Sequence, residues 1–422
     1  MESGRQVVVD ALNHRQPGKV PVDFGATSCS GMHCSVVAAL RDHFGLEKRL
    51  VKIHEPFQML GYIEDDLRAA LEVDATIAMP LATMFGNAIT GQWKEWKTWW
   101  GQTVLIPDTM NAAPSGDDGF VAYPQGDTSI PPSAKMPASG YFFDAIIRQE
   151  DLDEEDPNPE DNAEEFTILS EEELAKAAAS AKAARDTGLA VAAGLPGTAF
   201  GDIAFVPGMG LKKPKGVRDV AEWYMSTAAR PEYVHKVFDQ QCEIALENLK
   251  LLHTAVGGNY DAVFVCGTDF GTQISTFCSL EALEDLYLPY YKKINSWIHA
   301  NTAWKTFKHS CGAIEPFIDK FIEAEFDVLN PVQCSASGMD PQRLKDKFGS
   351  RITFWGGGID TQKTLPFGTP DEVRAQVLER CRIFNPGGGF VFNAIHNVQA
   401  MTPTANMVAL LGAIKEFNAA GK

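Results

Sequence analysis

The stretch WKTFKHSCGAIEPFIDKFIEAEFDVLNPVQ, residues 304–333, contains one complete unit of the fold that we expect. An apolar run ends in a histidine, a cysteine and a glycine, a helical pattern follows at 313–324, and a second apolar run begins at residue 326. Near-continuous apolar runs separated by helices are typical of parallel strands that are buried on both faces. The stretch therefore predicts a strand, a helix and a second strand parallel to the first.

The same unit recurs from about residue 166 to the C-terminus. We expect strands at 189–197, 260–271, 304–312, 326–333, 352–360 and 388–396. We expect helices between and after them at 170–188, 231–256, 279–301, 313–324, 340–347, 370–383 and 402–419. No Gly-rich nucleotide-binding turn follows the first unit, so the alternation favours a (β/α)8 barrel of the TIM type over a doubly wound sheet.

The N-terminal part adds a short helix and the first two strands of this barrel. We expect a helical extension at 4–14, a strand at 18–25, a helix at 35–45 and a strand at 73–80. Residues 86–165 break the rhythm, because they hold the tryptophan-rich GQWKEWKTWWGQ followed by turn-rich sequence. We interpret the chain as a single barrel domain over 1–422 with an irregular or β insertion at about 86–165.

Composition excludes several classes of function. The 422 residues are 45% hydrophobic and 22% charged, which is ordinary for a globular protein. The net charge of -18 repels nucleic acid and anionic membrane surfaces. The N-terminal sequence has no apolar core of signal-peptide length, and no window approaches 18 uninterrupted apolar residues. We expect a cytoplasmic protein whose eight cysteines are thiols, and which binds neither nucleic acid nor membrane.

His309 and Cys311 are the first candidates for chemistry. In a barrel of this type the active site lies at the carboxyl ends of the strands, where these two residues stand. Side chains two apart on a strand point to the same face, so both can converge on one point. Imidazole nitrogen and thiolate sulfur are ligands that zinc prefers, and a catalytic zinc site has three protein ligands and one open position. The pair therefore predicts a metal site with one further protein ligand.

The third ligand is open between three residues that end other strands. His396, at the end of the last predicted strand, is our first choice. Cys334 and Cys266 compete with it. The alternative for either cysteine is a small buried apolar side chain without a chemical role.

Two other groups of polar residues are expected at the same end of the barrel. Cys29, His33 and Cys34 lie in the sequence CSGMHC after the first strand, and their role is open between metal binding and structure. Asp269 and Gln273, in GTDFGTQ, follow the strand at 260–271. These two side chains are candidates for acid–base catalysis or for orienting a ligand, and an Asx-turn is the alternative for Asp269.

Short motifs in one fixed order carry a family resemblance. They are RQPGKVPVDFG, GLPGTAFG, DFGTQ with YLPYYKKI, KHSCGAIEPFIDKFIEAEFDVLNPVQ, FWGGGIDTQKTLPFGTPDEV and FVFNAIHNVQAMTPTANM. The chain resembles the uroporphyrinogen decarboxylase superfamily. This resemblance implies a (β/α)8 barrel with its pocket at the carboxyl ends of the strands, and a homodimer in the case of the decarboxylases. The superfamily contains cofactor-free decarboxylases of tetrapyrrole acetates and zinc-dependent methyltransferases that use corrinoids.

The departures from the family pattern distinguish between these two chemistries. The decarboxylases place arginines after the first strand and an aspartate after the second, to bind the tetrapyrrole. Here no arginine stands between Lys19 and Arg41, and DATIAMPLATMFG offers no acid after Asp74. The resemblance therefore disfavours tetrapyrrole decarboxylation.

The zinc methyltransferases carry H-x-C where this chain has His309 and Cys311, and a further cysteine near the place of His396. The resemblance implies methyl transfer between a corrinoid (methylcobalamin or a corrinoid protein) and a small-molecule thiol or methyl donor, as in O-demethylation. The corrinoid would be held by a partner protein. A decarboxylase or lyase that acts on a small carboxylic acid without corrinoid is the alternative, and a binding protein without activity is a third hypothesis. The direction of transfer stays open.

Overall fold

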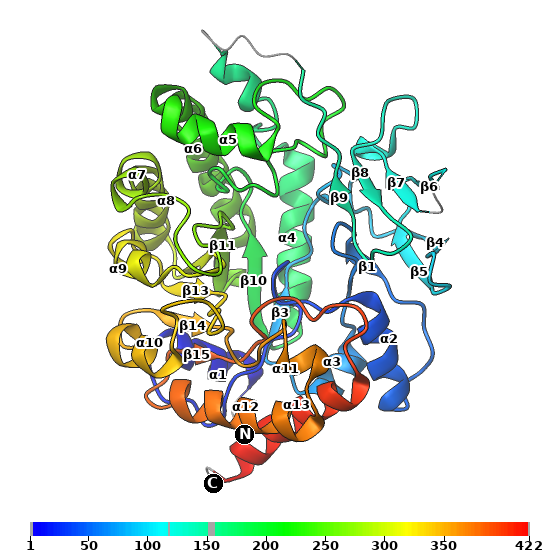
Figure 1. Ribbon diagram of the computed structural model, residues 1–422, viewed down its shortest axis with the longest axis vertical. Helices are drawn as coiled ribbons and strands as arrows, with labels where there is room; N and C mark the ends of the chain where they lie inside the picture. Colours follow the sequence, from blue (N-terminus) through cyan, green and yellow to red (C-terminus); the bar gives the residue numbers. More distant parts are fainter. Residues whose placement is uncertain (1–2, 117–118, 151–156, 421–422) are drawn as a thin grey trace.

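The computed structural model describes residues 3–116, 119–150 and 157–420, and a parallel sheet lies at its centre (Figure 1). The sheet has seven strands in the order β15-β14-β13-β12-β11-β10-β3. These strands are β3 (Ala75–Ile77), β10 (Ala190–Gly194), β11 (Ala262–Cys266), β12 (Lys305–His309), β13 (Val328–Asn330), β14 (Thr353–Trp355) and β15 (Phe390–Val391). Every neighbouring pair is parallel, which confirms the α/β barrel class expected from the alternating pattern.

The segment predicted as the first strand, 18–25, joins the two edges of this sheet. Val22 forms a parallel bridge with Phe392 just after β15. On the other edge Asp74 donates its backbone N–H to the Val22 carbonyl at 2.7 Å. The prediction of a regular strand here was wrong, because Pro21 has no N–H and the Val22 N–H binds the Asp74 carboxylate instead of a backbone carbonyl. The segment nevertheless fills the eighth position of the barrel.

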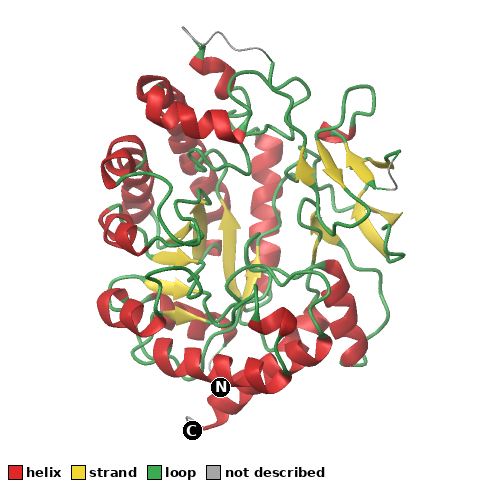
Figure 2. Cartoon of the chain, in the orientation of Figure 1, coloured by secondary structure: helices red, strands yellow, loops and turns green. Residues whose placement is uncertain are grey.

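Helices surround the sheet, and α1 packs against the inward side chains of the strands (Figures 1 and 2). They are α1 (Gly4–Leu12), α2 (Cys34–His43), α3 (Asp65–Leu71), α4 (Glu171–Asp186), α5 (Val220–Ala229), α6 (Pro231–Val256), α7 (Leu280–Leu286), α8 (Leu288–Asn301), α9 (Glu315–Glu323), α10 (Pro341–Phe348), α11 (Thr364–Phe367), α12 (Pro370–Phe384) and α13 (Thr404–Ala420). Short 3₁₀ turns lie at Pro124–Gly126, Pro159–Asn162 and Gly257–Asn259. Helix α4 begins at a capping box in which Ser170 and Glu173 bind each other's backbone N–H groups. No helix in the described ranges is long and apolar enough to cross a membrane.

One predicted helix is divided in the structure. The expected helix 279–301 is two helices, α7 and α8, that meet at Tyr287. Pro289 lies in the first turn of α8, where its missing N–H costs nothing. In a continuous helix the same proline ring would clash with the carbonyl four residues before it, so the chain starts a new helix there.

Antiparallel strands occupy the region between β3 and β10 for which we expect an irregular or β insertion. They are β4 (Trp93–Lys97) paired with β5 (Thr103–Pro107), and a four-stranded sheet of β6 (Ala112–Pro114), β7 (Phe120–Ala122), β8 (Ala134–Met136) and β9 (Asp144–Ala145). A further pair, β1 (Ile53–Glu55) and β2 (Leu60–Gly61), precedes α3. Figure 1 shows β4 to β9 together at the right, away from α7 to α9.

A separate apolar cluster fills the inside of the barrel. Its buried members come from α1 and from the inward positions of the strands: Val8, Ala11, Leu12, Ala26, Ala75, Ala190, Ala192, Ala262, Phe307, Val328, Trp355 and Val391. Small alanines on β3, β10 and β11 leave room for the large rings of Phe307 and Trp355. Because side chains two apart share a face, the next inward residue beyond Phe307 is His309, and beyond Val328 it is Asn330. The core therefore forms the floor beneath these two polar residues.

We predict that Asp74→Ala weakens the closure of the barrel. The Asp74 carboxylate accepts the Val22 N–H at 3.0 Å and pairs with Lys19 Nζ at 2.8 Å, although burial raises its pKa. Loss of this acceptor leaves a buried N–H unpaired, so the free energy of unfolding falls by about 1–3 kcal/mol. Asp74→Asn keeps an acceptor oxygen and should lose less. Urea denaturation measures both variants beside Asp319→Ala, a change at a half-exposed surface carboxylate.

If Asp74→Ala and Asp319→Ala unfold at the same urea concentration, the Asp74 carboxylate contributes nothing to closing the barrel.

Candidate metal centre

His309 is the last residue of β12, and its environment determines which of its nitrogens is free. Its Nδ1 lies 2.6 Å from Asn330 Oδ1. The Asn330 Nδ2 donates to the Trp355 carbonyl at 2.7 Å, so Oδ1 is the atom that faces His309. Because this oxygen only accepts, Nδ1 carries the proton and Nε2 presents a lone pair.

Two groups predicted from the sequence lie beside that lone pair. The Cys311 sulfur is 3.4 Å from His309 Nε2, and Asp269 Oδ1 is 3.8 Å from it. Ligand atoms of Asp269, His309 and Cys311 all lie within 4.8 Å of one another. The structure thus brings the H-x-C pair together on one face of the strand end, as the alternation of strand side chains predicts.

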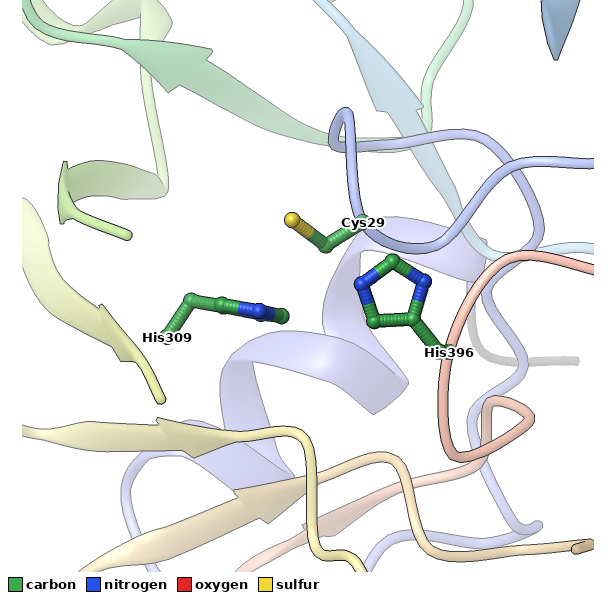
Figure 3. A group of neighbouring side chains, drawn as sticks. All are labelled: Cys29, His309 and His396. Atoms are coloured by element: carbon green, nitrogen blue, oxygen red, sulfur yellow. The ribbon is translucent and has the colours of Figure 1, made fainter. Parts of the chain in front are cut away.

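A second group of metal-ligating side chains shares His309 with the first. Ligand atoms of Cys29, His309 and His396 lie within 4.8 Å of one another, and Figure 3 shows the three side chains converging from separate parts of the chain. Cys29 stands on the loop after residues 18–25, and His396 on the segment after β15. The two histidine rings are 5.3 Å apart between centroids. Among the metal-capable groups of the described chain, His309 is therefore common to both.

His396 differs from His309 in its tautomer. Its Nδ1 accepts the backbone N–H of Asn397 at 2.8 Å. In the neutral ring the proton therefore sits on Nε2. Figure 3 shows the other nitrogen of this ring facing Cys29 and His309. His309 thus presents a lone pair to the site, whereas His396 presents an N–H.

The side chains of Cys29, His33 and Cys34, in the sequence CSGMHC, do not lie together in the structure. His33 Nδ1 accepts the Ser35 N–H and caps α2, and its Nε2 lies 3.0 Å from the Tyr141 carbonyl. Burial lowers the His33 pKa to about 4. Cys34 is the first residue of α2 and is buried. Of this cluster only Cys29 belongs to a metal-capable group of the described residues.

The competing cysteines lie elsewhere. The Cys266 sulfur is 2.8 Å from Thr268 Oγ1 and 3.2 Å from the hydroxyl of Tyr291 on α8. The register of β11 against β12 shifts between Phe264 and Cys266, so the side chain turns toward the helices. Cys334 packs at the edge of the outer core. Neither cysteine joins a metal-capable group in the part of the chain that the structure describes.

Asp269 connects the loop after β11 to the loop after β12, and Gln273 connects it to the loop after β13. Asp269 Oδ1 accepts the Cys311 N–H at 2.6 Å. Gln273 Oε1 accepts from Gln333, whose own Oε1 accepts the Gly312 N–H at 2.8 Å. Asp269 therefore faces the centre directly. Gln273 is linked to the centre only through Gln333 and the Gly312 N–H, next to Cys311.

Burial sets the protonation of the centre. It raises the pKa of the Cys29 and Cys311 thiols, and the negative charge of Asp269 raises both further. Burial lowers the pKa of His309 and of His396 to about 4. The thiols and imidazoles are thus neutral at pH 7. A bound cation reverses this preference for the thiols, because it stabilises the thiolate.

Two further acids surround the same point. Burial raises the pKa of Asp202 to about 6 and that of Glu55 to about 7, and both charges act on Cys29. The buried cation Lys308 donates to the Thr268 carbonyl at 2.7 Å and lies over the Phe270 ring at 5.0 Å, on the outer side of β12. The centre therefore combines soft thiol ligands, imidazole and buried acids, a set suited to a divalent cation such as zinc.

Comparison with known proteins relates residues 209–417 to a family. Residues 209–417 match the family model described as uroporphyrinogen decarboxylase (URO-D). Among solved structures, a methyltransferase from Methanosarcina mazei is similar over 99% of this chain and 99% of its own, with a TM-score of 0.55 and 14% identity, which shows a shared fold. No curated protein sequence matches the chain. Residues 209–417 thus belong to the uroporphyrinogen decarboxylase family, in agreement with the resemblance that the sequence motifs show.

Proposed function

We propose that the protein is a zinc-dependent methyltransferase that moves a methyl group between a corrinoid and a small-molecule thiol or methyl donor. The observation that carries this proposal is the lone pair of His309 Nε2, held 3.4 Å from the Cys311 thiol at the carboxyl ends of the strands. One imidazole and one thiol on a strand end form part of a catalytic zinc site. The family match and the fold shared with a methyltransferase support the same function.

His309 and Cys311 would hold the zinc ion, with a third ligand from either His396 or Cys29, which both lie beside His309. The bound ion would lower the pKa of an acceptor thiol, or polarise the leaving group of a methyl donor. Asn330 keeps the His309 proton on Nδ1, away from the centre. This hydrogen bond is the outer-shell contact that metal-binding histidines usually make.

Asp269 would act as the general base of the reaction. Its carboxylate lies 3.8 Å from His309 Nε2 and takes the proton that an acceptor thiol releases. The bond from the Cys311 N–H to Asp269 fixes the carboxylate against the strand end. The hydrogen bond from Gln333 to Gln273 ties the loop after β13 to the loop after β11.

The loops around the centre expose large apolar side chains. Phe205, Ile274, Phe367 and Met401 follow β10, β11, β14 and β15, and are 50%, 80%, 83% and 74% exposed. All four follow the carboxyl ends of strands, where the centre lies, and a contiguous exposed apolar surface is typical of a protein-binding site. They support the docking of a corrinoid-carrying protein over the centre.

The lyase alternative has less support. A decarboxylase must bind a substrate carboxylate, for which arginine is the usual partner. Arg41, the first arginine after residues 18–25, donates instead to Asp66 and to the Glu47 carbonyl beside α2. The acids around the centre, Asp202 and Glu55, repel an anionic substrate.

The direct test is methyl transfer from methylcobalamin to a panel of thiols by the zinc-loaded protein, followed by the absorbance change of the corrinoid. We expect transfer by the wild type and background rates for Cys311→Ser, since serine is a poor zinc ligand. The reverse direction is assayed with cobalt(I) corrinoid and methyl ethers. Turnover of a carboxylic acid that survives Cys311→Ser would favour the lyase instead.

Asn330→Ala should lower zinc affinity about 10- to 100-fold, because His309 loses the partner that fixes its tautomer. Asn330→Asp keeps an acceptor oxygen and should bind zinc more tightly than Asn330→Ala. Competition with a chromophoric chelator measures both, beside Asn301→Ala at the exposed end of α8. Equal zinc affinity in Asn330→Ala and Asn301→Ala would remove His309 from the zinc site.

Phe367→Glu should slow methyl transfer to or from a corrinoid-carrying protein without changing transfer with free methylcobalamin. The charge disrupts an apolar contact only where a protein docks. Asn301→Glu, at the exposed end of α8 and at the opposite end of the strands, is the matched control. A variant Phe367→Glu that keeps the wild-type KM for the carrier protein would exclude docking over α11.

A further inference from the structure

We propose that Lys308 is a positioning residue of the metal centre, and that its buried amino group holds the loop carrying Asp269 against the end of β12. This inference rests on the proposed function, because it takes His309 and Cys311 as metal ligands and Asp269 as the general base. Lys308 lies on the outer side of the strand and acts through the backbone that it binds there.

Lysine is an unusual residue at this position. Lys308 is the fourth residue of β12, and none of its surface is exposed. Buried outward positions of a parallel strand are usually apolar, because helices cover them. Within the described chain no carboxylate pairs with the amino group. Burial of an unpaired ammonium group costs free energy, so packing alone does not account for a lysine here.

Backbone carbonyls and aromatic rings surround the amino group instead. Lys308 Nζ donates to the Thr268 carbonyl at 2.7 Å and to the His309 carbonyl at 2.5 Å. Three ring centroids lie 5.0 to 5.7 Å from Nζ, and they belong to Phe270, Tyr291 and Phe321. Carbonyl oxygens and ring faces attract a cation, so they offset part of the desolvation that lowers the pKa of Lys308.

Both neighbours of Asp269 in the chain are bound to the end of β12. Before it, the Thr268 carbonyl accepts from Lys308. After it, the Phe270 N–H donates to the Ser310 hydroxyl at 2.9 Å. The loop is therefore held on each side of the carboxylate, and the lysine supplies one of the two holding contacts.

The position of Asp269 is critical for a general base. Its carboxylate accepts the Cys311 N–H at 2.6 Å and lies 3.8 Å from His309 Nε2. A general base must lie within hydrogen-bond reach of the proton that it takes. A misplacement of about 1 Å can slow a reaction about 100-fold. Since Lys308 binds both the Thr268 and the His309 carbonyls, it fixes the base and the metal ligand relative to each other.

Lys345 provides a matched control. Its Nζ donates to the Phe384 and Gly388 carbonyls at 2.8 and 2.9 Å, and burial lowers its pKa as it lowers that of Lys308. Gly388 precedes β15, so this lysine lies at the amino ends of the strands, away from the centre. Methionine in place of either lysine removes an amino group from two carbonyls and keeps a side chain of similar length.

Metal binding gives the first readout, without any assay of activity. Lys308→Met should bind zinc about 10- to 100-fold more weakly than the wild type, because the strand end that carries His309 loses its support. The visible spectrum of bound cobalt(II) should also change, since it reports the geometry of the ligands. Lys345→Met should match the wild type in both measurements. Lys308→Gln, which is smaller and uncharged, replaces Lys308→Met if circular dichroism shows that the latter does not fold.

Hydrogen exchange tests the loop directly. The amides of residues 267–273 should exchange faster in Lys308→Met than in the wild type or in Lys345→Met. The urea midpoint of unfolding should stay close to that of Lys345→Met, because methionine also removes the cost of burying a charge. Faster exchange in the loop at equal global stability separates positioning from a general structural role.

Kinetics provide the third readout. In Lys308→Met, kcat for methyl transfer to a thiol should fall about 10- to 100-fold with little change in KM, because the base is displaced and the substrate site is not. In an Asp269→Asn background the same substitution should add little, since Lys308 acts through Asp269.

The proposal fails if the variants at 308 and 345 show the same zinc affinity, cobalt spectrum and loop exchange. Failure of the proposed function looks different. A wild type that binds zinc but transfers no methyl group, beside weaker zinc binding in Lys308→Met, would contradict methyl transfer and leave the role of Lys308 intact. A wild type that binds neither zinc nor cobalt would overturn both.

Discussion

The structure depends on the closure of a parallel sheet across its first and last strands. Val22 and Phe392 are 370 positions apart and form the bridge that closes it. Closure places the loop after the first segment beside the segment after β15, so Cys29 and His396 become neighbours. Without closure, Cys29 and His396 would lie at opposite open edges of the sheet. His309 would then contact only residues from its own strand and the strands next to it.

The inward layers of the barrel explain why the centre is placed where it is. Phe307 and Val328 belong to the apolar floor, and the residues two positions further, His309 and Asn330, face each other across adjacent strands. The pairing of β12 with β13 sets His309 opposite Asn330, and their side chains meet at 2.6 Å. The tautomer of the histidine is therefore a consequence of strand register, and it needs no contribution from a ligand.

Much of this arrangement could be predicted from the sequence, because it depends on local periodicity. Alternating apolar runs and helices indicated the parallel sheet, and a spacing of two put His309 and Cys311 on one face. The break at Pro289 was missed because the apolar pattern continues across it. The direction of Cys266 was missed because a register shift beside Phe264 has no local sequence signal.

Cys29 shows the limit of such reasoning. Its place in the centre depends on how the loop from 26 to 30 folds over Asp23, and on a bond to Asn397 near the other end of the chain. A cysteine just after the first strand was a usable signal, since first and last strands are neighbours in a closed barrel. His33 and Cys34 gave the same signal and lie elsewhere, because His33 caps α2.

The protonation of the centre is consistent with the metal site that we propose. Burial keeps the thiols of Cys29 and Cys311 protonated and the two histidines neutral, so these four groups carry no charge that would attract a counter-ion from the protein. The partly charged acids Asp202 and Glu55 lie around them. A divalent ion that converts the thiols to thiolates neutralises its own charge within the site and is attracted by the acids outside it. The charges of Asp202 and Glu55 would oppose an anionic ligand in the same place, with Lys308 on the outer side of β12 as the nearby cation.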